Sequence, residues 1–354
     1  MAAYQVWALD GSYNKVAYLH RWQRLRYRIG LNQLCEATVD LPADDPKIAD
    51  LALMQRLLIR RDGALIWSGL LEGESFGISE QAPQGDVYAL DARDLTAYLL
   101  WRVIERPSGA DYDQRSGAAD DVAKAYVYYH AGAGAATARQ FSDLTVQANA
   151  SAAGTVTKLW VGGTLLEHLQ RLAAEKSFWW RMVPGATGVE FQTAYPLWGV
   201  DRTRGNGVNE ELVLTLDRRN VLSLAYRKDL LDHCNHFYMG GAGEGRDQLM
   251  VEQADSAAVA AYGRREMWVP ATQYISTSGL QAEGDRRIRE YRAYEAMSVA
   301  PKPGVIAPAN LGDQVTILER RYGRTFEFDG VITAIKFTVT PDGVERVEPE
   351  VTAV

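Results

Sequence analysis

The densest group of potential metal ligands in this sequence is residues 232–236, which read Asp-His-Cys-Asn-His. Imidazole nitrogens and thiolate sulfurs are ligands that zinc prefers in proteins. The pattern around the segment predicts a strand, in which His233 and Asn235 point to one face while Cys234 and His236 point to the other. Three ligands therefore cannot converge from this segment alone, and we interpret its histidines as structural.

Motifs that build nucleophilic, metal or phosphate sites do not occur in the chain. There is no Gly-x-Ser-x-Gly elbow, no His-Glu-x-x-His helix and no Cys-x-x-Cys pair. The glycine-rich stretch 240–245 lacks the Lys-Ser/Thr ending of a phosphate-binding loop, and Glu244 would repel an anion, so we interpret the stretch as a flexible connection. The sequence predicts that the protein is not an enzyme, with no catalytic, cofactor-binding or metal-binding residues and no cofactor.

Aromatic residues are the other chemistry that the sequence offers. Nine tryptophans and eighteen tyrosines could stack on sugar rings, but scattered aromatics more often fill cores or subunit interfaces. Trp179 and Trp180 are neighbours on a predicted strand, so one is expected in the core and the other at its boundary. His20, His130 and His168 are isolated in sequence, and His168 lies in an amphipathic helix, where we expect a surface or boundary position.

Length and composition limit the class of protein. A chain of 354 residues corresponds to two or three domains, and 47% hydrophobic residues can build a packed core. The net charge of −7 argues against a broad surface for nucleic-acid phosphates. No apolar run approaches the ~20 residues needed to cross a bilayer, so we expect no stable membrane insertion. Two cysteines are too few for a disulfide framework.

Residues 1–105 are predicted to form a first antiparallel β-barrel domain. In residues 24–29, apolar residues alternate with three arginines, which is the pattern of a strand with one buried face. The Asp62-Gly63 pair between two apolar runs predicts a hairpin. Asp94 is a candidate N-cap for a helix with an apolar stripe of Leu95, Tyr98, Leu99 and Val103.

Residues 106–219 and 241–302 are predicted to form an α+β middle domain. Residues 131–157 have weak periodicity and are expected to be an extended or mobile connection. Thr164 and Glu167 have the spacing of a capping box, which opens a helix before two strands. Helices are also expected at about 255–266 and 279–297.

Residues 220–240 and 303–354 are predicted to form a second, discontinuous β-barrel domain. The fold class expected is therefore α+β: two similar antiparallel β-barrels with an intervening helix-containing α+β region. The inward-facing sets in the last fifty residues alternate as strands do; they are Val315 and Ile317, Phe326 and Phe328, and Ile335, Phe337 and Val339.

The two strand-rich regions resemble each other in two pieces. Tyr27-Arg28, Leu31 and Cys35 match Tyr226-Arg227, Leu230 and Cys234 at an offset of 199 residues. The segment 67–71 and Phe76 match the segment 328–332 and Phe337 at an offset of 261. We interpret this as a duplicated barrel opened by a helical insertion, with chance similarity of amphipathic strands as the alternative. Three such chains could form a ring of six near-equivalent units.

The order of motifs along the chain resembles one known group of proteins. The motifs are a Leu-Pro-Ala-Asp-Asp-Pro segment at 41–46, Gly69 after a hairpin, a Thr-Leu-Leu-x-x-Leu helix at 164–169 before Phe178-Trp179-Trp180, the segments 235–240 and 262–266, and finally 311–316 and 330–332. This order resembles the baseplate hub, or tail tip, proteins of tailed bacteriophages, which are related to the hub of contractile tails and of type VI secretion. Each motif alone is loose, and their order is the stronger signal.

The resemblance implies a virion structural protein at the distal end of the tail, assembled in the bacterial host cytoplasm. It implies a homotrimer with pseudo-six-fold symmetry that joins the six-fold tail tube or distal tail ring to a three-fold central fibre or spike protein. Its channel would pass the tape measure protein and DNA without specific binding. The net charge of −7 suggests an acidic lumen that limits sticking of DNA.

Other functions remain open at this point. The hub of a phage-like contractile injection system is the nearest alternative. A cell-wall glycan-binding protein would carry exposed rows of Trp or Tyr, and a peptidoglycan-degrading tail protein would carry paired carboxylates or a metal-binding histidine set in a cleft.

Overall fold

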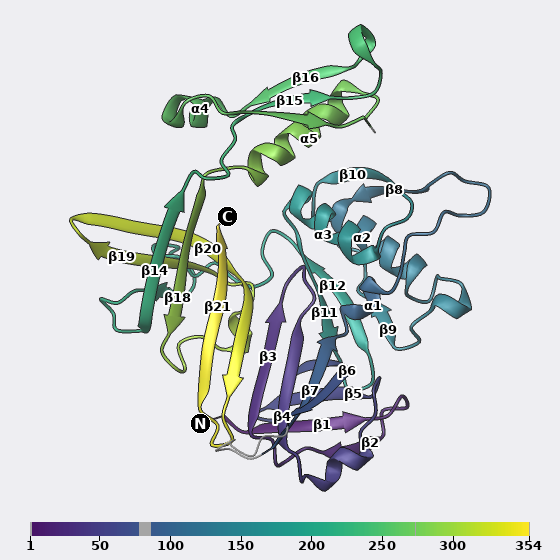
Figure 1. Cartoon of the computed structure of the whole chain (residues 1–354), viewed down its shortest axis with the longest axis vertical. Coiled ribbons are helices and arrows are strands. Elements are labelled where there is room, and N and C mark those ends of the chain that lie inside the picture. The colour runs from purple at the N-terminus through teal and green to yellow at the C-terminus, as the bar shows by residue number, and fades with distance from the viewer. Residues whose placement is uncertain (1, 78–85, 273, 354) are drawn as a thin grey trace. The chain divides into compact units, whose positions relative to one another are not determined.

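The computed structural model of the chain describes residues 2–77, 86–272 and 274–353 (Figure 1). These residues form a mixed α+β structure, so the predicted α+β class is confirmed. They divide into two compact units: residues 225–298 form the smaller unit, and the residues before and after them form the larger one. Within the described ranges, no helix is long and apolar enough to span a bilayer.

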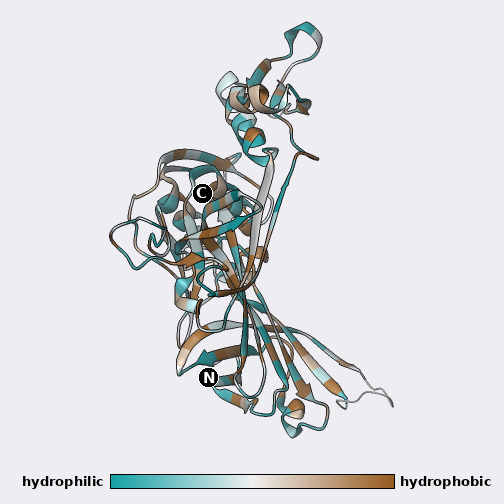
Figure 2. Ribbon diagram, turned by 90° about the vertical axis from the view of Figure 1, so that its left-hand side faces the viewer, coloured by the Kyte–Doolittle hydropathy of each residue, from teal (hydrophilic) through white to brown (hydrophobic). Residues whose placement is uncertain are grey.

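Eleven strands of the larger unit form one sheet. They are β1 (Tyr4–Leu9), β2 (Lys15–Tyr18), β3 (Arg24–Gly30), β4 (Glu36–Pro42), β5 (Arg56–Arg61), β6 (Ala64–Gly77), β7 (Val87–Asp94), β13 (Val213–Leu214), β19 (Gln314–Arg321), β20 (Arg324–Val339) and β21 (Glu345–Ala353). The order is β13-β19-β20-β3-β4-β7-β6-β5-β1-β2, and β21 also pairs with β20. Figure 2 shows hydrophobic and hydrophilic residues alternating along parts of the strands. In β3 the alternation is regular, and Leu25, Tyr27 and Ile29 are buried as predicted.

Strand β20 joins the two regions that were predicted to form separate barrels. Its first half pairs with β19, and its second half pairs with β3, from Ala334 opposite Gly30 to Val339 opposite Leu25. The sheet path ends at β13 and β2, and none of the sheets in the described part of the chain closes on itself. The two closed barrels are therefore not confirmed. A strand of 16 residues is long enough to share its hydrogen bonds with both regions.

The second piece of the internal repeat corresponds to two similar three-stranded units within this sheet. Strands β5, β6 and β7 form the first repeat unit, and β19, β20 and β21 form the second. In each unit, a two-residue hairpin turn joins the first two strands. The turn is Asp62-Gly63 in the first unit, with φ of 51° and 83°, and Tyr322-Gly323 in the second, with φ of 55° and 70°. Two successive positive φ values define a type I′ turn, which matches the twist of the flanking strands. The hairpin predicted at Asp62 is confirmed.

The two repeat units also carry a β-bulge at the same place. The register between β6 and β7 shifts between Leu71 and Gly73, and the register between β20 and β21 shifts between Ile332 and Ala334. Both positions are related by the offset of 261 residues that the sequence shows. Because a bulge is set by hydrogen-bond pairing rather than by side-chain hydrophobicity, this agreement is independent of the apolar pattern.

A glycine just before each bulge is required by close packing of the backbone. A Cβ atom on Gly69 would lie 2.2 Å from the carbonyl oxygen of Arg93, and one on Gly330 would lie 2.6 Å from the carbonyl oxygen of Thr352. Arg93 and Thr352 stand at equivalent places in β7 and β21. The match of sequence, turn, bulge and glycine contact favours a true duplication over chance similarity.

The first piece of the repeat maps β3 onto β14 (Val221–Asp229). Strand β3 pairs with β4, and β14 pairs with β18 (Tyr294–Pro301) in a two-stranded sheet. The chain between β3 and β4 is short, whereas residues 230–293 lie between β14 and β18 and belong to the smaller unit. The insertion thus begins before the predicted residue 241.

The middle of the larger unit combines small sheets with helices. Its elements are α1 (Ala97–Leu100), β8 (Asp113–Ala118), α2 (Ala119–His130), η2 (Thr137–Arg139), β9 (Leu144–Val146), β10 (Thr155–Trp160), α3 (Leu165–Lys176), β11 (Trp179–Pro184) and β12 (Val189–Ala194); the short helices η1 (Pro46–Asp50) and η4 (Pro308–Asn310) lie elsewhere in this unit. Strand β10 pairs with β8, and β12 pairs with β11 and β9. Helices α2 and α3 pack together over a core that includes Leu169, Trp180 and Phe191.

Several predictions for this region are confirmed and others are wrong. The capping box is present: Thr164 Oγ1 accepts from Glu167 N–H at 3.2 Å, and Glu167 accepts from Thr164 N–H at 3.1 Å. Trp180 is buried and Trp179 is at the boundary.

The helix expected after Asp94 is a single turn, and Val103 is exposed because the chain leaves the helix at Trp101. Residues 131–157 are not merely a connection, since they supply two strands and buried core residues such as Ala131, Leu144, Ala153 and Val156.

The smaller unit is a three-stranded sheet with a helix on one face. Its elements are β15 (His236–Gly240), η3 (Gly245–Asp247), β16 (Met250–Ala254), α4 (Ser256–Tyr262), β17 (Glu266–Pro270) and α5 (Thr277–Glu290). The strand order is β16-β15-β17, and α5 packs against β15 and β16 over Phe237, Met239 and Leu280. Residues 236–240, which were expected in the second barrel, therefore pair within this unit. Residues 294–297 are in strand β18 rather than at the end of a helix.

Candidate interaction surfaces

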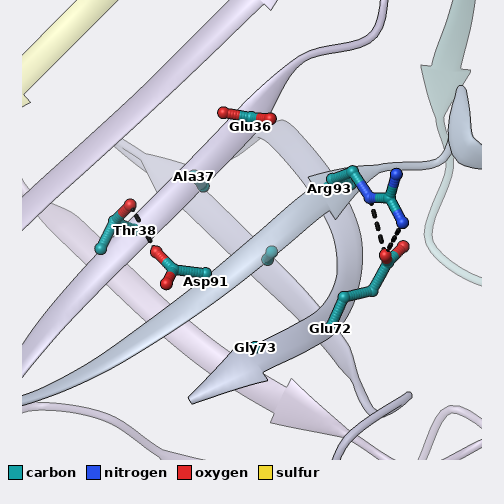
Figure 3. Close-up of a pocket in the computed structure, with 8 residues that line it drawn as sticks. Glu36, Ala37, Thr38, Glu72, Gly73, Asp91 and Arg93 are labelled. Carbon is teal, nitrogen blue, oxygen red and sulfur yellow. Dashed lines mark hydrogen bonds and ion pairs between the residues drawn. The ribbon is translucent and has the colours of Figure 1, made fainter. Parts of the chain in front are cut away.

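The bulge of the first repeat unit opens an acidic pocket of about 320 Å³ on the larger sheet. Neighbouring strands β4, β6 and β7 supply its walls; the polar lining residues are Glu36, Thr38, Glu72, Asp91 and Arg93 (Figure 3). Thr38 Oγ1 donates to Asp91 Oδ1 at 2.9 Å, and Arg93 Nε donates to Glu72 Oε2 at 2.7 Å. Figure 3 shows Glu36 outside both of these interactions.

The charge of this pocket suits a cation rather than an anion. The pocket is lined by three carboxylates and one guanidinium group. Because Arg93 pairs with Glu72, Asp91 and Glu36 give the pocket its net negative charge. In the described ranges, no three His, Cys, Asp or Glu residues are placed to hold a metal ion. The charge of the pocket is therefore that of a site for a basic group.

Residues 232–235 are irregular rather than part of the strand that was predicted, and β15 begins at His236. His233 Nδ1 lies 2.9 Å from the carbonyl oxygen of Tyr291, and Asn235 Oδ1 accepts from Arg265 N–H at 2.9 Å. The thiol of Cys234 is buried and donates to the carbonyl oxygen of Arg265. These contacts tie the segment to its surroundings.

One face of the three-stranded sheet of the smaller unit lies opposite the face that α5 covers. Residues 236, 238 and 240 of β15 alternate onto this face, and Trp268 of β17 stands beside Tyr238 in the pairing register. Trp268 is 52% exposed and Met250 is 48% exposed. At the other end of the face, His236 Nε2 lies 2.5 Å from Glu252 Oε1, and Arg264 contacts Glu252 as well. Trp268 is a single exposed indole and not the row of aromatics that a glycan-binding surface requires.

A buried histidine–aspartate pair was not predicted from the sequence. His130 Nε2 lies 2.7 Å from Asp113 Oδ2, so the end of α2 is fixed to the start of β8. Burial lowers the pKa of His130, although Asp113 acts in the opposite direction. The two residues are 17 positions apart, and the signal available was weak: an isolated histidine at the end of an amphipathic helix. His168, for which a surface or boundary position was expected, lies at the edge of the core, against Trp160 and the carbonyl oxygen of Gly162.

A second buried polar cluster fixes strand β5 to the middle of the larger unit. The carboxylate of Asp143 pairs with Arg56 and accepts hydrogen bonds from Tyr13 at 2.6 Å and Tyr98 at 3.1 Å. Burial raises the pKa values of both tyrosines, so they stay protonated and act as donors. The cluster has no exposed nucleophile, and its role is to position the sheet.

Three glycines of the stretch 240–245, which was interpreted as a flexible connection, pack closely against their neighbours: Gly240, Gly241 and Gly243. A Cβ atom on Gly240 would lie 2.5 Å from the ring of Trp268, and one on Gly241 would lie 2.8 Å from Leu280. Gly243 has φ of 98°, which favours glycine. The stretch turns the chain tightly from β15 toward β16.

The comparison with known families gives an assignment for nearly the whole chain. Residues 3–351 match the family described as Siphovirus ReqiPepy6 Gp37-like protein. The chain belongs to this family. The resemblance to phage tail proteins inferred from the order of motifs is thereby confirmed.

Solved structures of tail proteins share the fold. The tail protein from Neisseria meningitidis MC58 has a TM-score of 0.62 and 15% identity, covering 99% of this chain and 96% of that chain. The 43 kDa tail protein of prophage MuSo2 from Shewanella oneidensis has a TM-score of 0.62 and 15% identity, covering 100% and 98%. A chain of the Francisella PdpA-VgrG complex has a TM-score of 0.52 and 8% identity, covering 99% and 57%. No curated protein matches the chain.

Proposed function

We propose that this protein is the structural hub of a phage tail baseplate, a homotrimer that surrounds a central channel. The observation that carries the proposal is the pair of repeat units, which share their turn, their bulge and their glycine contact. Two equivalent units per chain give six in a trimer. A ring with six near-equivalent faces on one side and three-fold symmetry on the other can join partners of different symmetry.

The partners follow from this symmetry. The pseudo-six-fold face would contact the distal tail protein or the tail tube ring, and the three-fold face would contact a central fibre or spike protein. In the ring, residues 1–105 would supply one module, and residues 303–354 together with β14 would supply the other. The family and the shared fold of tail proteins support this location in the virion tail.

The channel is proposed to pass the tape measure protein and DNA without binding them specifically. The net charge of −7 supports a lumen that repels phosphates. A density map of the assembled ring would test this, because a wall lined by arginines and lysines would contradict it.

The role proposed is structural rather than catalytic. The polar side chains of the clusters described above form hydrogen bonds that hold neighbouring elements together. In the acidic pocket, the one arginine, Arg93, is paired with Glu72. Zymography of the purified protein on bacterial cell walls tests this point. A cleared zone that persists after independent purifications would instead support a peptidoglycan-degrading tail protein.

The experiment that tests the hub itself is electron microscopy of the assembled particle with this chain labelled. We expect three copies around the axis at the distal end of the tail, below the last six-fold ring. Label along the tail shaft, or one copy at the extreme tip, would overturn the proposal. Particles without a DNA-filled capsid would identify the related hub of a phage-like contractile injection system.

A further inference from the structure

The contact between β3 and β20 shows how the two halves of one chain meet. Tyr27 stands directly opposite Phe337, and their rings stack with centroids 4.7 Å apart and planes 7° apart. Both side chains are almost fully buried. Beside them, Arg28 Nη2 lies 2.5 Å from Glu350 Oε2 of β21. One stacked aromatic pair and one ion pair therefore mark this strand contact.

The internal repeat gives each member of this aromatic pair a counterpart elsewhere in the chain. The offset of 261 maps Phe337 onto Phe76 of β6, and the offset of 199 maps Tyr27 onto Tyr226 of β14. Phe76 is 69% exposed and Tyr226 is 36% exposed. The aromatic residues that are buried between β3 and β20 thus have counterparts that are exposed, Phe76 and Tyr226.

The charged pair has counterparts as well. Arg28 maps onto Arg227, whose side chain is 67% exposed and pairs with Asp229 of the same strand at 2.7 Å. Glu350 stands opposite Ala334 just past the bulge of the second repeat unit, and Asp91 stands opposite Gly73 just past the bulge of the first. Asp91 is therefore the counterpart of Glu350, and it lines the acidic pocket (Figure 3).

A third pair of positions changes from apolar to charged. Ile335 and Ile29 are opposite each other in the contact within the chain, and both are buried. Their counterparts are Glu74 of β6 and Lys228 of β14, which carry opposite charges. Aromatic and acidic positions of β6 and β7 are thus matched by aromatic and basic positions of β14.

We propose that residues 73–77 of β6 pair in antiparallel fashion with residues 225–229 of β14 from a neighbouring copy of this chain. Phe76 then lies opposite Tyr226 of the next copy, Glu74 lies opposite its Lys228, and its Arg227 reaches Asp91 in the acidic pocket. Among the described strands, this part of β6 pairs with β7 alone. The contact is head-to-tail, which gives a ring when the rotation between copies closes, and its closure after three copies rests on the proposed trimeric hub.

Cysteine pairing between chains tests this register directly. The variants Phe76→Cys and Tyr226→Cys are purified separately, mixed in equal amounts and oxidised, so that the mixed disulfide can form only between copies. Directly opposed residues of antiparallel strands lie about 4.5 to 5.5 Å apart at Cα, within reach of a disulfide. Both native cysteines are buried and do not compete. We expect the mixed disulfide dimer as the main product on a non-reducing gel.

The matched control is Phe76→Cys mixed with Ala225→Cys. A shift of one residue turns the second cysteine to the other face of the sheet, so we expect at least about tenfold less of the mixed dimer. Equal yields from both mixtures would overturn the register.

Charge exchange provides a second measurement that does not depend on oxidation. The dissociation midpoint is the protein concentration at which half of the trimer has dissociated. Glu74→Lys or Lys228→Glu alone is expected to raise this midpoint by about tenfold, because like charges then lie opposite each other at each of the three interfaces. The double variant should restore the midpoint of the parent. Glu74 also accepts a hydrogen bond from Tyr88, so rescue by the second change is the decisive result. Tyr322→Ala, at an aromatic residue 96% exposed on a different hairpin, should leave the midpoint unchanged.

Light scattering on the parent protein separates the two proposals. A trimer that gives no mixed disulfide and no charge rescue overturns the strand pairing while the hub proposal stands. A chain that stays monomeric at every concentration, up to millimolar, overturns the self-assembling trimer and the strand pairing with it.

Discussion

The two repeat units of the larger sheet share a backbone but differ in the side chains that surround it. Each has a type I′ turn and a bulge, with a glycine packed on the carbonyl oxygen of the next strand. At the bulge, the first unit has the ion pair of Glu72 with Arg93, whereas the second has the hydroxyl groups of Thr333 and Thr352 3.1 Å apart. The backbone geometry is thus the common element, and the chemistry is specific to each copy.

This difference shows which features a duplicated ring module has to keep. The glycine and the bulge fix the path of the strand, so a change there alters every later residue in the register. The bulge residue itself has no partner in the register, and its side chain is acidic in one copy and neutral in the other. Alternating modules could therefore hold the same position in a ring and offer different contacts to a partner.

The largest difference between the copies is expected at the aromatic residue two positions before the glycine. Trp67 is almost fully buried, whereas Phe328 is only half-buried. Trp67→Ala should lower the free energy of unfolding by about 4 kcal/mol, and Phe328→Ala by about 1 to 2 kcal/mol, because less apolar surface is lost. Urea titrations followed by circular dichroism measure both values. Equal losses would mean that the two environments are alike despite their different burial.

The glycine contact should be equally strict in both copies. Gly69→Ala and Gly330→Ala would each place a methyl group within 2.6 Å of a carbonyl oxygen, which cannot move without breaking the sheet. We expect a loss of about 2 to 3 kcal/mol in the free energy of unfolding for each. Gly11→Ala is the control, since no atom lies within 4 Å of its Cβ position, and it should change stability by less than about 0.5 kcal/mol. If Gly330→Ala left the free energy of unfolding unchanged, only the first copy would need the close approach of glycine to the next strand.

Local signals in the sequence predicted much of this architecture. The Asp62-Gly63 turn, the capping box at Thr164 and the buried alternation in β3 were all visible, because each depends on residues that are neighbours along the chain. The offset of 261 residues anticipated the repeat units. The acidic pocket was not anticipated, because its carboxylates come from three strands and meet only through the bulge.

Pairing between strands that are far apart in the chain could not be predicted from the sequence. Strand β20 has the alternation of any half-buried strand, and nothing in its residues specifies that its second half pairs with β3, some 300 positions earlier. Two closed barrels were therefore a natural but unconfirmed expectation. The contact of His130 with Asp113 depends in the same way on how α2 packs on β8.

A pH-dependent difference between the copies is expected at Asp94. This residue stands opposite Gly69, where the second unit has Ala353 opposite Gly330. Burial raises the pKa of Asp94 to about 7, against the effect of the hydrogen bond from Thr96. An unfolded aspartic acid titrates near ~4, so the folded state holds a proton between about pH 4 and pH 7 that the unfolded state releases. Its contribution to stability is complete below about pH 4 and is lost as the pH rises through 7.

Asp94→Asn should remove this dependence. At pH 8, the variant is expected to be more stable than the parent by about 1 to 3 kcal/mol, and the two should converge near pH 4. Thermal unfolding at several pH values measures the difference. A gap that stays constant from pH 4 to pH 8 would assign the effect to packing rather than to the proton.

The smallest effect is expected at the hairpin turns. The first position of a type I′ turn needs positive φ, which Asn and Asp adopt more readily than an aromatic residue. Asp62 meets this need in the first unit, and its carboxylate also accepts from Ala3 N–H at 2.9 Å, whereas Tyr322 in the second unit has φ of 55° and is almost fully exposed. Tyr322→Asn should therefore raise the free energy of unfolding by about 0.5 kcal/mol, while Asp62→Asn should not. If Tyr322→Asn lowers stability instead, the tyrosine ring must make a contact that compensates for its backbone strain, and the two turns would differ in more than their preference for positive φ.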